Sequence, residues 1–112
     1  MTDLQIRQKC EDLIAYGYIA VRQFPKSERH VLAQEIRLTM WAILRLIIIA
    51  NRRYHKKTTL QDLDAELDLL RSQIRIAKEL QYLDFQKYEV WSRHVDEIGK
   101  MLGGWLKSQA LA

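Results

Sequence analysis

Four long stretches of the chain repeat apolar residues at alternating intervals of three and four, and this pattern constrains the fold more than any other feature. Such spacing puts the side chains on one face of an α-helix, so each stretch predicts an amphipathic helix. The chain has only one Pro and four Gly in 112 residues, too few turn formers for a many-stranded β-sandwich or barrel. The four stripes are Ile6, Cys10, Leu13, Gly17, Ala20 and Phe24; Leu32, Ile36, Thr39, Ile43, Leu46 and Ala50; Leu60, Leu63, Leu67, Leu70, Ile74 and Ala77; and Tyr88, Trp91, Val95, Ile98, Leu102 and Trp105.

Helix ends are predicted from capping residues and helix breakers. Pro25 is expected to end the first helix, and the polar residues 51–58 the second, with basic groups that complement the C-terminal dipole. The expected N-caps are Thr2 or Asp3, Ser27, Thr58 or Thr59, and Asp84, in helix order.

Short connections between helices of about 20 to 26 residues force neighbouring helices to run antiparallel. The sequence therefore predicts an all-α, antiparallel up-down-up-down four-helix bundle in a single domain, residues 1–112. The apolar run 40–50 contains Arg45 and is about half the roughly 20 residues that a membrane span needs. The first residues resemble no export signal, and one Cys fits a reducing compartment, so we expect a cytoplasmic protein without a membrane span.

The second predicted helix carries apolar residues away from its core stripe. On a helical projection Trp41 and Ile48 fall at about 100 to 120° from Arg29, on a different side from the stripe. One interpretation is that they pack under the ends of a neighbouring helix of the same chain. The favoured interpretation is a subunit interface, because clustered exposed apolar groups usually mark contacts.

Gly99 and Gly103 form a Gly-x-x-x-Gly pattern in the fourth helix, and Gly104 follows directly. Each glycine inside a helix costs up to about 1 kcal/mol of helix stability. The favoured interpretation is that the glycines allow the backbone of this helix to approach a neighbouring helix closely. The alternative is a helix break at Gly103 and Gly104.

No catalytic or metal-binding pattern accompanies the helices. His30, His55 and His94 lack the Glu-x-x-His spacing of di-iron bundles, and no phosphate-binding Gly-rich loop or Gly-x-Ser-x-Gly motif occurs. Cys10 lies on an apolar stripe, where a cysteine behaves as a small buried hydrophobe. We therefore expect no enzyme activity, no metal and no cofactor.

The net charge of +4 is concentrated in one quarter of the chain. Residues 26–57 carry eight basic groups against Glu28 and Glu35, and Arg45, Arg52 and Lys56 fall within about 40° of one another on the outer side of the second helix. Basic residues at a helix end can increase solubility and complement the helix dipole, or they can bind phosphates. From the charges alone, the first interpretation is favoured. The eight groups are Lys26, Arg29, Arg37, Arg45, Arg52, Arg53, Lys56 and Lys57.

Two segments resemble a known family: residues 24–32 (FPKSERHVL) and 97–105 (EIGKMLGGW), supported by Leu70-Arg71 and the Leu-rich heptads. Over roughly residues 20–108 the chain is similar to the small four-helix bundles that include the accessory variability determinant (Avd) proteins of diversity-generating retroelements. This resemblance implies a homopentameric barrel, RNA and DNA binding with little sequence preference, association with the element's reverse transcriptase, and no catalysis. With it, phosphate binding becomes the favoured role of Arg37, Arg45, Arg52, Arg53, Lys56 and Lys57.

The same superfamily includes bundles encoded by intervening sequences in bacterial 23S ribosomal RNA genes, which gives an alternative. The chain would then be a non-catalytic oligomer that acts as a structural or protein-interaction module, with its basic face against an acidic protein. Salt-sensitive binding to unrelated RNA and DNA distinguishes the two functions.

Overall fold

The computed structural model describes the backbone of residues 3–111 and the side chains of residues 5–109. This part of the chain forms four α-helices and no strand, which confirms the predicted all-α class. Two short 3₁₀ turns, η1 (Val21–Gln23) and η2 (Lys26–Glu28), lie between the first two helices. The helices are α1 (Asp3–Ala20), α2 (Leu32–Arg52), α3 (Lys57–Glu79) and α4 (Phe85–Leu111).

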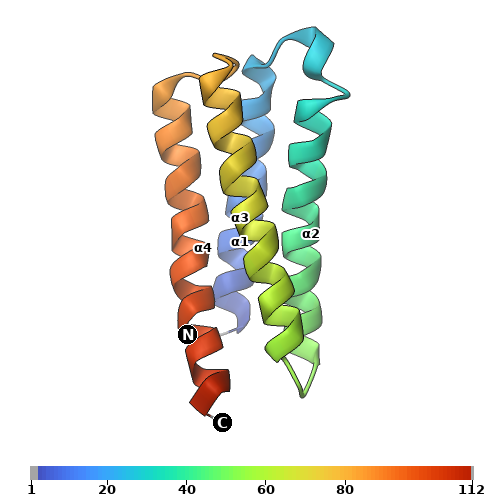
Figure 1. Ribbon diagram of the computed structural model, residues 1–112, viewed down its shortest axis with the longest axis vertical. Helices are drawn as coiled ribbons and strands as arrows, with labels where there is room; N and C mark the ends of the chain where they lie inside the picture. Colours follow the sequence, from blue (N-terminus) through green and yellow to red (C-terminus); the bar gives the residue numbers. More distant parts are fainter. Residues whose placement is uncertain (1–2, 112) are drawn as a thin grey trace.

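The helices run up, down, up and down along one long axis (Figure 1). α1 packs against α2 and α4, and α3 packs against the same two helices, so the four form a closed ring around one core. The bundle measures 46 × 23 × 20 Å. The α1–α2 and α3–α4 connections lie at one end, and the α2–α3 connection lies at the other.

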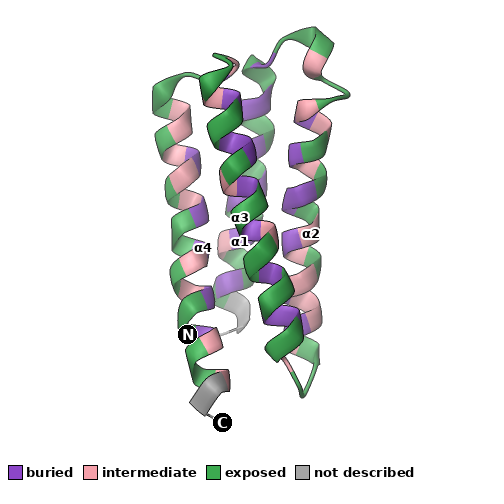
Figure 2. Cartoon of the chain, viewed as in Figure 1, coloured by how far each residue is buried: buried purple, intermediate pink, exposed green. Residues whose placement is uncertain are grey.

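The predicted apolar stripes form the core, and Figure 2 shows their buried residues on the inward sides of the helices. Every stripe residue is buried except Leu32, Leu46 and Tyr88, which are half-buried. Met40 and Ile47 also lie in the core, so the buried face of α2 is wider than its stripe. None of the helices in residues 3–111 has a segment apolar and long enough to cross a membrane.

The start of α2 differs from the prediction. Ser27 is not its N-cap, because Ser27 lies inside η2 and α2 begins only at Leu32. The N–H of Leu32 donates to Glu28 Oε2 at 3.1 Å, so a carboxylate four residues upstream satisfies this helix end. The extra 3₁₀ turn lengthens the connection that the sequence pattern placed at Pro25.

Of the N-caps predicted for the other three helices, one is confirmed. α3 begins at Lys57, so the caps predicted at Thr58 or Thr59 are wrong. For α1, Thr2 lies outside the described residues, and Asp3 is the first helical residue instead of the residue before the helix. Asp84 is confirmed as the N-cap of α4, since its Oδ1 accepts the N–H of Lys87 at 2.8 Å.

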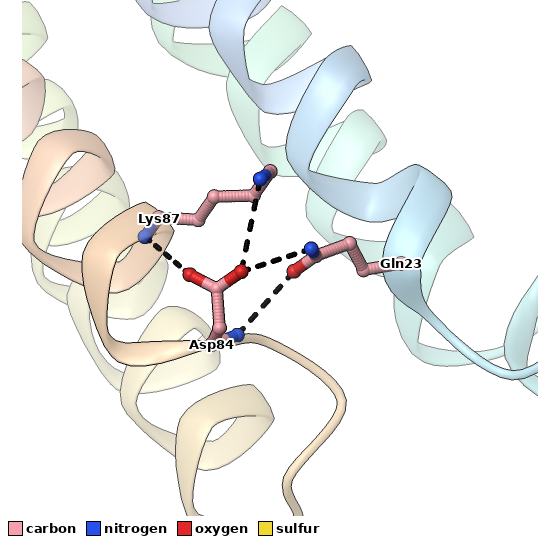
Figure 3. A network of polar contacts seen from close by, with 3 residues as sticks. All are labelled: Gln23, Asp84 and Lys87. Carbon is pink, nitrogen blue, oxygen red and sulfur yellow. Dashed lines mark hydrogen bonds and ion pairs between the residues drawn. The ribbon is translucent and has the colours of Figure 1, made fainter.

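Asp84 also joins two connections that are far apart in sequence (Figure 3). Its Oδ2 accepts a hydrogen bond from Gln23 Nε2 at 2.9 Å, and its N–H donates to Gln23 Oε1 at 3.3 Å. Lys87 Nζ lies 3.7 Å from the same Oδ2. The hydrogen bond from the Lys87 N–H, followed by that from Gln23, holds the pKa of Asp84 below its ordinary value.

α3 ends in a Schellman motif that contains no glycine. Gln81 adopts a positive φ of 63°, and its N–H donates to Lys78 O while that of Tyr82 donates to Ala77 O. These bonds satisfy carbonyl groups of the last helical turn and reverse the chain toward Asp84.

The fourth-helix glycines do not pack as predicted. Gly103 and Gly104 are exposed, and a Cβ built on either would meet nothing within 4 Å. The alternative of a helix break is also wrong, because α4 continues to Leu111. At Gly99 a Cβ would lie 2.5 Å from Arg71 Nη2, so a long side chain of α3, not its backbone, occupies the space beside this glycine.

Candidate nucleic-acid interface

The α2–α3 connection gathers three of the predicted basic residues on the surface. Arg52 is the last residue of α2, Arg53 follows it, and Lys57 is the first residue of α3. All three are exposed. We call this group the basic end; it lies at the opposite end of the bundle from the Gln23–Asp84 contact.

The segment of sequence that contains this group lacks acidic residues. Residues 36–61 contain no Asp or Glu. None of the ion pairs in the described part of the chain involves Arg45, Arg52, Arg53 or Lys57. Among the described residues the Arg53 guanidinium makes one hydrogen bond, in which Nη1 donates to the buried Thr59 Oγ1 at 2.9 Å. The positive charge of the basic end is therefore open to an external anion.

Lys56 has a different position from the one predicted. It was expected to continue the outer stripe of the second helix, but α2 ends at Arg52 and the chain turns back before Lys56. Its Nζ donates to Ala50 O at 2.6 Å and to Arg53 O at 2.5 Å, and lies 5.9 Å from the Trp105 ring centroid. Lys56 thus binds the free carbonyl groups at the C-terminus of α2 and is half-buried.

Arg45 and Arg37 lie on α2 itself, at increasing distance from the basic end. Arg45 is exposed two helical turns before Arg52, so it extends the basic end along the helix. Arg37 precedes Arg52 by 15 positions, which is about 22 Å along a helix. Its Nη2 donates to Arg29 O and Gln34 Oε1, each at 2.9 Å. The structure thus brings Arg45, Arg52, Arg53 and Lys57 together and separates Arg37 from them.

The second apolar face of α2 is partly covered by α1. Trp41 is 42% exposed, and its Nε1 donates to Tyr18 OH at 3.0 Å. Ile48 is half-buried. Contacts within the chain therefore cover only part of Trp41 and Ile48. The rest of the Trp41 surface is exposed, beside Leu38, which is 53% exposed.

A protein-family model described as bAvd-like matches residues 4–109, which include nearly all of the four helices. The chain belongs to the bAvd-like family. This confirms the resemblance to Avd proteins, and the match begins well before the segment at Phe24 that first indicated it. No curated protein matches the sequence of this bAvd-like chain.

Other reactive groups of this bAvd-like chain are sequestered or dispersed. Burial raises the pKa of the Cys10 thiol to about 12, with the Glu11 charge a smaller cause, so the thiolate that reacts or binds metal is strongly disfavoured. Among the described residues no group of three His, Cys, Asp or Glu side chains is placed to hold a metal ion.

Sequence reasoning missed one basic cluster of this bAvd-like protein. Arg22 lies in η1, Lys26 lies in η2, and Arg29 lies between η2 and α2. Together with Arg37 they line one pocket. The basic residues in 26–37 are visible in the sequence as a concentration of charge. Helical periodicity does not apply to a connection, so a helical projection could not predict that these side chains lie together.

Proposed function

We propose that this chain is a non-catalytic accessory protein of a diversity-generating retroelement, which binds RNA and DNA through the basic end and Arg45. The observation that carries the proposal is the open positive charge of residues 36–61, where Arg45, Arg52 and Lys57 are exposed and have no ion-pair partner in the described chain. Membership of the bAvd-like family gives the biological setting.

Binding of this kind has little sequence preference. Lys and Arg side chains that neutralise phosphates release counterions, and this supplies affinity without reading bases. Tyr54, 89% exposed in the middle of the α2–α3 connection, is the aromatic ring best placed to stack on an unpaired base. Stacking also tolerates any base, so it adds affinity without specificity.

We further propose that the chain assembles into a homopentamer that associates with the element's reverse transcriptase. The exposed apolar surface around Leu38 and Trp41 supports self-association. A ring of subunits repeats the basic end around the assembly, so several copies engage one nucleic acid and raise its overall affinity. The accessory role is then to hold template RNA and its complementary DNA near the polymerase.

The test is a salt titration of binding to an RNA and a DNA of unrelated sequence. The variant Arg52→Glu/Lys57→Glu should bind both at least about tenfold more weakly at low salt, with a salt slope smaller by about two. Lys56 is left intact because its reversal would disrupt the end of α2. The matched control is Arg75→Glu/Arg93→Glu, which changes the charge equally at two exposed positions on α3 and α4.

Two results would contradict the proposal. In the first, the parent protein binds neither nucleic acid, which favours the alternative of a protein-interaction module. In the second, the Arg52/Lys57 variant and the control lose affinity equally, so only net charge matters. Circular dichroism and mass measurements on each variant confirm that fold and assembly are unchanged.

A further inference from the structure

The end of the bundle opposite the basic end contains a pocket of about 440 Å³. It lies where η1, η2 and the start of α2 meet, so the α1–α2 connection forms most of its wall. The volume falls within the range of small-molecule sites, about 300 to 1,000 Å³. Five basic or imidazole side chains line what we call the connection pocket: Arg22, Lys26, Arg29, His30 and Arg37.

The described residues that line the connection pocket include no Asp or Glu. Glu28 is near in sequence, but its Oε2 accepts the Leu32 N–H and its Oε1 faces Tyr82 OH at 3.5 Å. Within residues 5–109 no ion pair or hydrogen bond engages the side chains of Arg22, Lys26 or Arg29; the bond from Arg37 goes to the Arg29 carbonyl. The fold therefore holds several like charges around one space without a counter-charge from the protein, an arrangement that an anion stabilises.

Two parts of the pocket wall are fixed before a ligand binds. The Arg37 guanidinium is held by the Arg29 carbonyl and Gln34, so it loses little further freedom on binding an anion. Ala33, the second residue of the 21-residue α2, also lines the pocket. The helix dipole places partial positive charge at this end of α2, and the Glu28 carboxylate on the Leu32 N–H already offsets part of it. The attraction of the pocket for phosphate therefore rests mainly on its basic side chains.

We propose that the connection pocket binds the terminal phosphate of a nucleotide. A phosphate monoester carries more negative charge than the diester of a nucleic-acid backbone and offers three oxygens to arginine forks. Phe24 and the partly exposed Tyr18 give the pocket an apolar wall for the attached nucleoside. The same chemistry is present in a free nucleotide and at the 5′-phosphate end of a nucleic acid.

The test is an NMR titration of the full chain with AMP, adenosine and inorganic phosphate at constant moderate salt. AMP should shift the backbone amide signals of residues 26–33, inorganic phosphate should shift them more weakly, and adenosine should leave them unchanged. Lys26→Gln/Arg29→Gln should weaken AMP binding about tenfold or more. Lys107→Gln is the control, because this exposed lysine on α4 does not line the pocket and its removal should leave AMP binding unchanged.

A second arm identifies the source of the phosphate. Two short oligonucleotides of one sequence, with a 5′-phosphate or a 5′-hydroxyl, compete with AMP for the signals of residues 26–33. Stronger competition by the phosphorylated strand identifies a nucleic-acid end as the ligand, and equal competition identifies the free nucleotide.

The proposal is overturned if AMP shifts no pocket signal, if adenosine shifts the same signals equally, or if the Lys26/Arg29 variant binds AMP as well as the parent. Binding of AMP to the connection pocket should not depend on the basic end. Arg52→Glu/Lys57→Glu should bind AMP like the parent, so failure of the pocket and failure of the proposed nucleic-acid interface are observed in different variants.

Discussion

Gly17 is the residue whose size the fold restricts most visibly. It lies buried on the inner face of α1, where a Cβ would come within 2.5 Å of Met40 Sδ, 2.6 Å of Met40 Cε and 3.1 Å of Trp91. Met40 and Trp91 are themselves completely buried, so neither has free space to move into. Gly17 therefore lets α1 approach two large side chains of α2 and α4.

A pair of single-methyl substitutions tests this difference between glycines. We expect Gly17→Ala to destabilise the protein by about 1 to 2 kcal/mol, because overpacking outweighs the better helix propensity of alanine. Gly103→Ala should instead stabilise it by about 0.5 to 1 kcal/mol, since its Cβ meets nothing within 4 Å and only the propensity changes. Urea denaturation followed by circular dichroism measures both. Equal shifts of the unfolding midpoint in the two variants would contradict the packing described at Gly17.

At the scale of the helices, the N-cap of α4 also fastens the first connection of the chain. Asp84 accepts the Lys87 N–H and binds both amide atoms of Gln23, 61 positions earlier in sequence. Lys9 and Glu97 make a second contact between α1 and α4, an ion pair at 2.9 Å that lowers the pKa of Glu97. These contacts involve exposed groups, so they respond to pH and salt more than the core does.

We expect the Asp84 contacts to stabilise the fold only while the carboxylate is ionised. Its pKa is lower in the folded protein than the unfolded value of about 3.9, so the stabilisation is fully present above pH 4 or so and is lost as pH falls through the folded pKa. Asp84→Ala should lower the melting temperature by a few degrees at neutral pH, and the gap to the parent should narrow below about pH 4. The measurement is a series of thermal melts.

Asp84→Asn is the control for this pH series, because asparagine also caps helices but does not titrate. The difference between the Asn and Ala variants should stay nearly constant with pH. A gap between parent and Asp84→Ala that remains unchanged down to about pH 2 would show that the ionised carboxylate is not responsible.

The helices and the core could be predicted from sequence, whereas several ends could not. Heptad spacing reflects burial of apolar surface, which is the largest favourable contribution to folding, and it placed every stripe residue in a buried or half-buried position. Each cap is worth only about 1 kcal/mol, so other local conformations compete with it: Glu28 replaces Ser27 at the start of α2, and α3 begins one residue before Thr58. The glycine pattern misled because spacing alone does not tell which side of a helix faces a neighbour.

For the basic residues too, positions on helices could be predicted from sequence and positions in connections could not. Arg45 and Arg52 lie on α2, and a helical projection correctly put them on its exposed outer side. Lys56 and the connection pocket depend on how the chain turns after Arg52 and before Leu32, and no periodic pattern describes those turns. For those turns the sequence indicated which residues are charged but not where they lie in space.

At the scale of the whole molecule, two neighbouring helices of the bundle expose large apolar side chains. Leu38 and Trp41 are 53% and 42% exposed on α2, and Leu69 and Ile76 are 47% and 50% exposed on α3. α2 and α3 pack against each other, and Trp41 also contacts Tyr18 of α1. Apolar groups gathered in this way usually mark protein contacts.

We expect the protein to form a homo-oligomer, with a mass about five times the 13.3 kDa of one chain if the proposed pentamer is correct. Light scattering coupled to gel filtration measures this mass. Leu38→Glu/Trp41→Glu should reduce it by placing charge in the contact. Phe85→Glu, at the 63% exposed first residue of α4 and away from this surface, should not. A parent that elutes as a 13.3 kDa monomer at micromolar concentration would contradict self-association.

The length of α2 sets a spacing between the two positive ends of the molecule. The connection pocket surrounds the start of this 21-residue helix, and the basic end surrounds its finish, so roughly 30 Å separates them. A strand whose terminal phosphate occupied the connection pocket would therefore have to run the whole length of α2 before its backbone reached the basic end.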